Sequence, residues 1–291
     1  MVLSRSVVRD YVALTKPRII SLLLLTALGG MFLAAGGPPE FSLVVLVLGC
    51  GFLAAGGAHA LNHGLERDID GMMKRTVSRP VAGGRITSRQ ALAFGSLLNI
   101  VAFIVLGALV NPLSAVLTLS GTLFYVFVYT LWLKRTTPQN IVIGGAAGAI
   151  PPMVGWTAVT GSLALPAIYL FAIIFFWTPP HFWALALLIK DDYARAKIPM
   201  LPVVNGIIET KWSILLYSLL LVALTLMFFT TQAVGWIYFA ASGTLGLGFV
   251  YYSWRLLRQP GVHGARGLYM YSLLYLTLLF VAVAVDSVVA V

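Results

Sequence analysis

The polar stretch 62–80 contains the residues of this chain whose types and spacing are best suited to chemistry. The chain has only nine acidic residues, and Glu66, Asp68 and Asp70 lie here within five positions. Asn62, Glu66 and Asp70 recur at every fourth residue, so on a helix they lie on one face. Two carboxylates and an amide oxygen on one face repel one another unless a cation lies between them, and hard oxygen ligands of this kind suit Mg²⁺.

Basic residues follow this acidic face at once, at Lys74, Arg75 and Arg79. Lys and Arg bind phosphate oxygens, and Arg can do so through two parallel hydrogen bonds. Mg²⁺ prefers to share its coordination shell with water and substrate phosphates. The stretch therefore predicts a Mg²⁺–diphosphate site, and the alternative is a charged loop that is merely solvated.

Two further polar segments could complete this site. Lys134 and Arg135 lie in a short connection between apolar segments and could contact the diphosphate, although a plain topological anchor would look the same. The segment 190–202 carries a second pair of acidic residues, Asp191 and Asp192. Four apolar segments separate it from the first acidic stretch, so the two could face each other across a bundle.

His181 lies inside an apolar segment, directly after Pro179 and Pro180 and between Trp177 and Trp183. An ionisable residue within such a segment is by default a functional-site hypothesis. Its aromatic neighbours could stack on a flat hydrophobic ligand. The alternative is a structural histidine held by a hydrogen bond.

The composition is that of an integral membrane protein. The 291 residues are 60% hydrophobic and 10% charged, with a mean hydropathy of +0.95, whereas a soluble domain has roughly 25% charged residues. The net charge of +10 is explained by membrane topology and not by nucleic acid. A single cysteine excludes an intramolecular disulfide. No cleavable signal or transit pattern is visible, which favours a prokaryotic inner membrane.

Apolar segments recur about nine times, which predicts an all-α membrane protein with a single domain over 1–291. Two of the segments contain proline pairs, at 151–152 and 179–180, which predict interruptions of the helix beside a cavity. The predicted spans are 19–37, 42–63, 89–110, 113–133, 140–160, 165–189, 211–231, 235–256 and 268–290.

The distribution of charge predicts the orientation of the chain. All 19 Lys and Arg residues lie in or beside the N-terminal segment and alternate connections, while the opposite connections and the C-terminus carry none. The positive-inside rule therefore places the N-terminus in the cytoplasm and the C-terminus outside, which requires an odd number of spans. Seven of the nine acidic residues share the cytoplasmic side, so the site is expected there.

These motifs together resemble the UbiA-type intramembrane prenyltransferases and, within that family, the branch that farnesylates protoheme IX. The similarity covers nearly the whole chain, and segment 177–202 carries the likeness to the heme branch. Glu66 stands where many members have Asp. The motifs lie at 15–18, 62–80, 129–136 and 177–202.

The resemblance implies a bundle of nine helices around a central cavity that opens to lipid, with Mg²⁺ as the cofactor. The implied metal ligands are Asn62, Glu66, Asp70, Asp191 and Asp192. The implied diphosphate contacts are Lys74, Arg75, Arg79, Lys134, Arg135 and Lys190. His181 is the candidate heme contact, and Trp177 and Trp183 are the candidate lining of its pocket.

The resemblance further implies transfer of a farnesyl group from farnesyl diphosphate to the vinyl group of heme b, with addition of water, to make heme O for terminal oxidases. Candidate partners are a downstream heme A synthase and oxidase assembly factors. One alternative is an enzyme of the same family that prenylates a quinone precursor or a chlorin. Another is a cation transporter, which needs acidic residues deep within several spans, whereas here they lie at the cytoplasmic ends.

Overall fold

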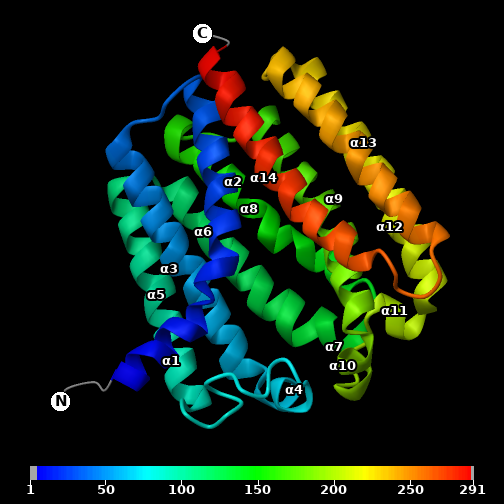
Figure 1. The fold of residues 1–291 in the computed structure, drawn as a ribbon. Helices are drawn as coiled ribbons and strands as arrows, with labels where there is room; N and C mark the ends of the chain where they lie inside the picture. The colour runs from blue at the N-terminus through cyan, green and yellow to red at the C-terminus, as the bar shows by residue number, and fades with distance from the viewer. Residues whose placement is uncertain (1–4, 290–291) are drawn as a thin grey trace.

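The apolar segments form long helices that run side by side with a common tilt (Figure 1). The computed structural model describes residues 5–289, so the extreme ends of the predicted domain 1–291 lie outside it; within the described range it contains no strand. Eight of its helical segments are long and apolar enough to span a membrane. They are α2 (Pro17–Ala35), α3 (Phe41–Leu65), α5 (Ser88–Leu109), the continuous segment Pro112–Thr136, α8 (Asn140–Thr160), α9 (Leu165–Leu188), the segment Gly206–Thr231 that begins with α12 (Gly206–Phe228), and α14 (Ala265–Val289).

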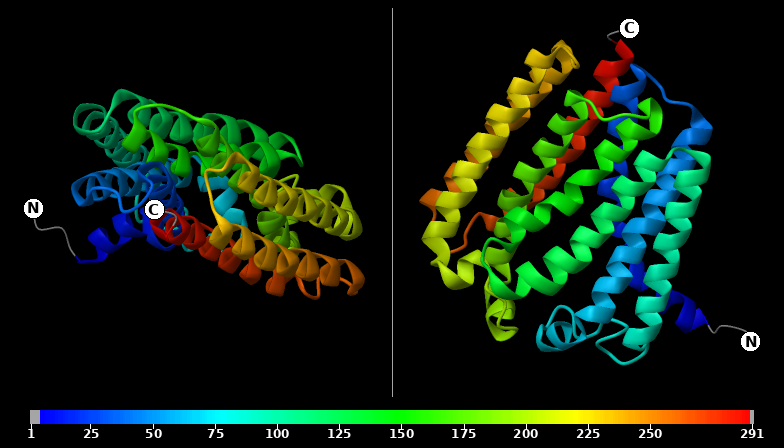
Figure 2. Two further views of the ribbon diagram at one scale, coloured as in Figure 1. Left: turned by 90° about the horizontal axis from the view of Figure 1, so that it is seen from above. Right: turned by 180° about the vertical axis from the view of Figure 1, so that it is seen from behind.

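A ninth helix, α13 (Trp236–Arg258), has 23 residues and is long enough to span a membrane, but it is less apolar than the eight segments above. It packs between α12 and α14 and runs the length of the bundle beside them (Figures 1 and 2). The all-helical membrane fold expected from the sequence is confirmed. The count of nine spans and the orientation of the termini stay predictions, although the described chain begins and ends at opposite ends of the bundle (Figure 1).

The predicted interruptions at the proline pairs are wrong. α8 continues through Pro151 and Pro152, and α9 continues through Pro179 and Pro180. Proline removes one backbone donor and crowds the preceding turn, but neighbouring helices hold these segments in helical form.

The close approach of α2 and α8 depends on glycine. A Cβ on Gly155 would overlap the backbone carbonyl of Ala27, and a Cβ on Gly30 would overlap that of Pro152. Small residues of this kind let membrane helices pack backbone to backbone. This contact fixes α2 against the middle of the bundle.

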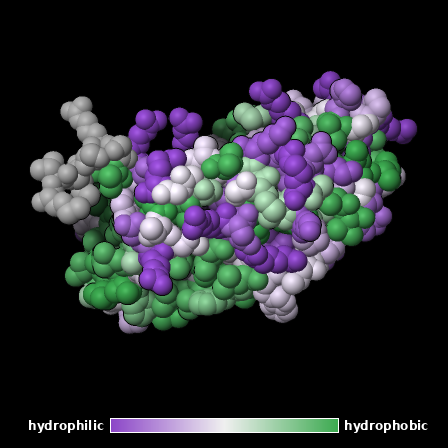
Figure 3. Space-filling view, turned by 90° about the horizontal axis from the view of Figure 1, so that it is seen from below, coloured by the Kyte–Doolittle hydropathy of each residue, from purple (hydrophilic) through white to green (hydrophobic). Residues whose placement is uncertain are grey.

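Four helices of 4 to 11 residues gather at one end of the bundle, the end at which the polar loops lie (Figures 1 and 3). Hydrophilic side chains cover much of this face, whereas the adjoining sides of the bundle are apolar (Figure 3). The short helices are α1 (Arg5–Thr15), α4 (Arg67–Met72), α10 (Lys190–Arg195) and α11 (Leu201–Val204).

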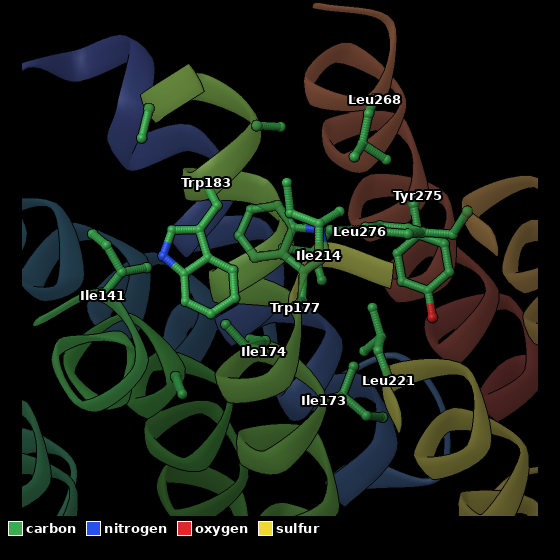
Figure 4. Packing of buried hydrophobic residues seen from close by; sticks show 14 of the residues in the cluster. Ile141, Ile173, Ile174, Trp177, Trp183, Ile214, Leu221, Leu268, Tyr275 and Leu276 are labelled. Carbon is green, nitrogen blue, oxygen red and sulfur yellow. The ribbon is translucent and has the colours of Figure 1, made fainter. Parts of the chain in front are cut away.

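The largest hydrophobic cluster lies among α8, α9, α12 and α14 (Figure 4). Trp177 and Trp183 of α9 contribute its largest side chains, and α14 contributes Tyr275 and Leu276. α9 is the helix that this cluster surrounds most completely, with 67% of its apolar window buried. The core therefore holds α9 rigidly, and α9 carries His181.

Candidate active site

The acidic stripe lies where α3 ends and α4 begins. Asn62 is in the last turn of α3, Glu66 is the residue that joins the two helices, and Asp70 is in α4. The Glu66 N–H donates to the Asn62 carbonyl (2.9 Å) and the Asp70 N–H donates to the Glu66 carbonyl (2.8 Å), so helical turns continue across the junction. All three residues are at most 2% exposed. The prediction that Asn62, Glu66 and Asp70 lie on one helical face is confirmed. Their role as metal ligands stays a prediction.

Each buried carboxylate is held by a cation from elsewhere in the chain. Lys134 Nζ lies 2.6 Å from both carboxylate oxygens of Glu66. Arg79 Nη1 donates to both oxygens of Asp70, at 2.8 and 2.9 Å. Loss of either cation would leave a buried charge uncompensated, which is costly. The two carboxylates therefore need positive charge beside them at all times.

A π-helix, η1 (Phe124–Leu133), passes this stripe and leads into the short helix α7 (Lys134–Thr136). Such turns are rare and often mark functional sites. Thr130 accepts a hydrogen bond from the Asn62 side-chain amide (3.2 Å). Tyr125 and Tyr129 stack with ring centroids 5.5 Å apart, and Lys134 Nζ lies 6.0 Å from the Tyr129 ring centroid. The segment thus contacts Asn62 through Thr130 and places the Tyr129 ring near Lys134, the cation that holds Glu66.

Arg135 belongs to the surface, although it is adjacent to Lys134. It donates to the carboxylate of Asp68 at 2.8 and 3.0 Å, and the two side chains are 35% and 57% exposed. This hydrogen bonding lowers the pKa of Asp68 below its ordinary value. Lys74 is also exposed. The structure thus brings Lys134 and Arg79, but not Arg135 or Lys74, to the buried carboxylates.

The second acidic segment forms α10 and approaches the first through Tyr193. Burial raises the pKa of the Tyr193 hydroxyl, while the nearby charge of Arg75 opposes this rise and that of Glu66 adds to it. Tyr193 is therefore within electrostatic reach of the acidic stripe. Tyr193 of α10 and Ile69 of α4 also belong to the same hydrophobic cluster, while a metal site shared by the two acidic segments stays a prediction.

The acidic side chains of α10 themselves lie further out. Asp192 forms an ion pair with Arg195, Asp191 is exposed and Lys190 is partly exposed. Within residues 5–289, no three His, Cys, Asp or Glu side chains gather closely enough to hold a metal ion. The roles assigned to these three residues stay predictions.

The donor set of the stripe nevertheless fits Mg²⁺ bound together with a diphosphate. Mg²⁺ is usually held by one or two carboxylates, with the remaining positions filled by water and substrate phosphates. Glu66 and Asp70 supply two buried carboxylates, and Asn62 supplies an amide oxygen on the same face. These three are the residues that would hold the ion.

A pocket of about 650 Å³ opens beside the Arg79–Asp70 pair, and Lys16, His63 and Arg85 are among its lining residues. Lys16 precedes α2 with a left-handed backbone (φ 52°, ψ 59°), which non-glycine residues seldom adopt outside functional or strained positions. Burial, reinforced by the charge of Arg79, lowers the pKa of Lys16 to about 7. An anion bound in the pocket would restore its full charge.

Sequence reasoning missed several residues that line this site. Lys16 and Thr130 lie within the motifs 15–18 and 129–136, but neither residue type by itself indicates a place in the site. Tyr125 and Tyr129 have the spacing of one helix face, but aromatic residues in a membrane segment are equally typical of a lipid-facing surface. No spacing or residue type in the sequence indicated that Tyr193 lies near the site.

His181 lies on α9, about two turns before the helix ends at the polar end of the bundle. It is 6% exposed, and its ring stacks on Trp177 with a centroid distance of 4.2 Å. Trp183 lies on a different side of α9, where its indole packs edge-on against Tyr217 of α12 at 5.3 Å. The structure therefore brings Trp177, but not Trp183, to His181.

Comparison with known proteins agrees with the motifs. The model of the UbiA prenyltransferase family matches residues 23–279. A protein named protoheme IX farnesyltransferase from Symbiobacterium thermophilum is 52% identical over 97% of this chain and 95% of its own length. Proteins of that name from Chloroflexus aurantiacus and Roseiflexus sp. (strain RS-1) are each 52% identical over 98% of this chain. The chain spans about half the length of these two relatives, 49% and 53%.

Solved structures share the fold at low sequence identity. One, described as digeranylgeranylglyceryl phosphate synthase in membranes, superposes with a TM-score of 0.80 at 17% identity, over 97% of this chain and 98% of that one. A UbiA homologue from Archaeoglobus fulgidus, bound to GPP and Mg²⁺, gives 0.69 at 17% identity, over 95% and 99%. With a family model over most of its residues and a relative matched along nearly its whole length, the chain belongs to the UbiA prenyltransferase family.

Proposed function

We propose that the protein transfers a farnesyl group from farnesyl diphosphate to a vinyl group of heme b, with addition of water, to give heme O. The observation that carries this proposal is the buried stripe of Asn62, Glu66 and Asp70 with Lys134 and Arg79 held against it. The choice of heme as acceptor is supported by the name of relatives that are 52% identical along this chain, and by His181 inside the bundle beside aromatic rings.

The chain's own residues bind and neutralise the diphosphate. Arg79 and Lys134 already lie beside the carboxylates of Asp70 and Glu66. Each can redirect part of its hydrogen bonding from the carboxylate to phosphate oxygens of the substrate. Lys16, in the adjoining pocket, becomes fully charged as an anion approaches. Mg²⁺, when bound by Asn62, Glu66 and Asp70, would supply further positive charge at the leaving group. Stabilising the charge that develops on a leaving group is the largest general contribution to catalysis.

The reaction follows from this charge arrangement. The bond between C1 of farnesyl and the diphosphate oxygen breaks, and the electron pair leaves with the diphosphate. The terminal carbon of the vinyl group then attacks C1, which forms a carbon–carbon bond and leaves a cation at the carbon next to the porphyrin ring. Water adds to that carbon and loses a proton, which gives the hydroxyethylfarnesyl group. A bundle that excludes water until this step suits such chemistry.

The site is proposed to face the cytoplasm, in the inner membrane of a prokaryotic cell. The basic residues gather at the end of the bundle that holds the site, and the positive-inside rule places that end in the cytoplasm. Heme b and the prenyl chain would enter from the lipid. The product would pass to a heme A synthase or to oxidase assembly factors.

The test is a transfer assay with the protein in membranes, supplied with heme b, farnesyl diphosphate and Mg²⁺, and analysed by chromatography and mass spectrometry. We expect a product heavier than heme b by a farnesyl group and a hydroxyl group. Asp70→Asn and addition of EDTA should each abolish it. Asp68→Asn is the matched control because Asp68 is on the same helix but exposed, and it should retain most activity.

A product formed only with a quinone precursor would reject heme as acceptor and keep the diphosphate site. Equal activity of the Asp70→Asn and Asp68→Asn variants would reject the site itself. Absence of transfer to both acceptors by the unaltered protein would contradict the proposed activity.

A further inference from the structure

Ser272 of α14 makes two hydrogen bonds with its hydroxyl group, and together they determine the tautomer of His181. Ser272 Oγ lies 2.7 Å from His181 Nδ1 and 2.6 Å from the backbone carbonyl oxygen of Tyr269. A carbonyl oxygen can only accept, so the single hydroxyl proton goes to Tyr269. The hydroxyl oxygen is then free only to accept, and His181 must carry its proton on Nδ1.

This assignment leaves the lone pair of neutral His181 on Nε2. Nε2 has no hydrogen-bond partner among residues 5–289, and it is not sealed inside the protein. The ring nitrogens of His59 and His63 are different, since they are fully enclosed and also lack partners. His181 therefore presents one accessible nitrogen that is prepared to accept a bond from a ligand.

The imidazole ring is also held in one plane. Trp177 stacks on one side with a centroid distance of 4.2 Å and an interplanar angle of 18°, and Tyr269 stacks with 4.9 Å and 27°. The Trp177 indole N–H donates to the backbone carbonyl of Ser272 at 2.8 Å. Ser272 thus binds His181 through its side chain and binds the ring that supports His181 through its backbone.

We propose that Ser272 is a positioning residue that holds His181 as the Nδ1–H tautomer, with Nε2 directed at the iron of the heme substrate. The inference rests on the proposed function for the identity of the ligand. Neutral imidazole is a common ligand of heme iron. A histidine that binds a metal usually donates its other N–H to a neighbouring acceptor, which sets the ring orientation and raises the basicity of the bound nitrogen. The fully buried Ser272 hydroxyl is that acceptor here.

The test compares heme b binding to the unaltered protein, Ser272→Ala and Ser272→Thr, all as full chains in detergent or nanodiscs, by titration of the Soret band. Removal of a hydrogen-bond partner of a metal ligand typically lowers affinity by roughly 10- to 100-fold, and for a neutral hydroxyl we expect about tenfold. Thr retains the hydroxyl and should restore binding. Ser242→Ala is the matched control because Ser242 is fully buried and bonds only the carbonyl three residues earlier, that of Phe239.

A spectroscopic measurement separates positioning from general structural support. The iron–imidazole stretching band of the ferrous heme complex, measured by resonance Raman, depends on the hydrogen bond at the opposite ring nitrogen. It should shift to lower frequency in Ser272→Ala and in Ser272→Cys, which preserves volume if the alanine variant folds poorly. In a His181→Ala background, where the ligand is absent, Ser272→Ala should cause no further loss of heme affinity.

Unchanged affinity and an unchanged stretching band in Ser272→Ala and Ser272→Cys would overturn the inference. Imidazole ligation that survives in His181→Ala would also overturn it. These results are independent of the transfer assay: a protein that binds heme b through His181 but farnesylates another acceptor retains this inference and loses the proposed function. In the reverse outcome, the protein forms heme O but the iron–imidazole band does not change when Ser272 is substituted. That result would support the proposed function and contradict this inference.

Discussion

Glu66 and Asp70 are nearly inaccessible carboxylates, and each is neutralised by one basic side chain. The acidic stripe could be predicted because acidic residues are so scarce in this chain that three within five positions are conspicuous. The pairing of Glu66 with Lys134 could not, because the two are separated by 68 positions and no spacing rule connects them. Lys134 and Arg135 look alike in sequence, yet only Lys134 reaches a buried partner.

The difference between these two neighbours gives a prediction about stability. Lys134→Gln removes the cation that pairs with the buried carboxylate of Glu66, so we expect a loss of roughly 3–5 kcal/mol in the free energy of unfolding, together with loss of activity. Arg135→Gln removes an exposed pair and should cost about 1 kcal/mol or less. Thermal unfolding in detergent measures both.

The combined variant Glu66→Gln with Lys134→Met serves as the control. It removes both charges and should recover most of the lost stability without recovering activity. Equal destabilisation by Lys134→Gln and Arg135→Gln would show that the Glu66–Lys134 pair is not buried as described.

A second residue-scale prediction concerns pH. Lys16 has a pKa lowered to about 7 by burial and the charge of Arg79, so it is charged below that pH and neutral above it. A neutral Lys16 attracts diphosphate less, and kcat/KM for farnesyl diphosphate should therefore fall as pH rises, by roughly tenfold between about pH 6 and about pH 9.

Lys16→Arg is the comparison, since a guanidinium stays charged over this range. Titration of the diphosphate substrate affects both proteins equally. The ratio of their kcat/KM values therefore reports the titration of Lys16 alone. A ratio that stays constant with pH would contradict the assignment.

At the scale of elements, the long helices could be predicted from apolar segments of membrane length. The π-helical geometry of part of one of them could not. Nothing in the composition of Phe124–Leu133 distinguishes a π-helix from an α-helix, and the segment packs against α3 and α8, which the local sequence does not specify. For the same reason the inward orientation of Tyr125, Tyr129 and Thr130 could not be read from periodicity. For the proline pairs the sequence predicted interruptions, whereas the structure has continuous helices. The surrounding helices support turns that proline alone would break.

The contact between α2 and α8 gives a prediction at this scale. Gly155→Ala places a methyl group against the backbone of Ala27, and overpacking of this kind typically costs about 1–3 kcal/mol. Gly148 lies on the same helix with open space around it, so Gly148→Ala should be neutral or stabilising by up to about 1 kcal/mol. The melting temperatures of the two purified variants make the comparison. Similar melting temperatures would mean that α2 can move away from α8 at little cost.

At the scale of the whole molecule, the sequence predicted a single helical membrane bundle with its polar site at one end, because hydropathy and charge act over long segments and depend little on detail. Among the predicted spans, α13 is the one whose composition is less apolar than that of its neighbours. Its length and its position between α12 and α14 favour a crossing.

The orientation can be measured with single cysteines introduced into a Cys50→Ser background. Gln232 and His263 are exposed residues on either side of α13. We expect an impermeant maleimide to label Gln232→Cys in intact cells and His263→Cys only after lysis. Labelling of both from the same side would show that α13 does not cross.

The cations already seated on Glu66 and Asp70 have a thermodynamic consequence for the order in which ligands bind. At the proposed metal site, free Mg²⁺ would compete with Lys134 and Arg79 for the same carboxylates, so its affinity for the resting protein is expected to be low. A diphosphate offers the two displaced cations new partners and brings negative charge that the metal ion neutralises. Metal ion and diphosphate therefore raise each other's affinity by the same factor, as linkage requires. Two ligands that each bind weakly alone would then saturate the site together, with a favourable coupling free energy between them.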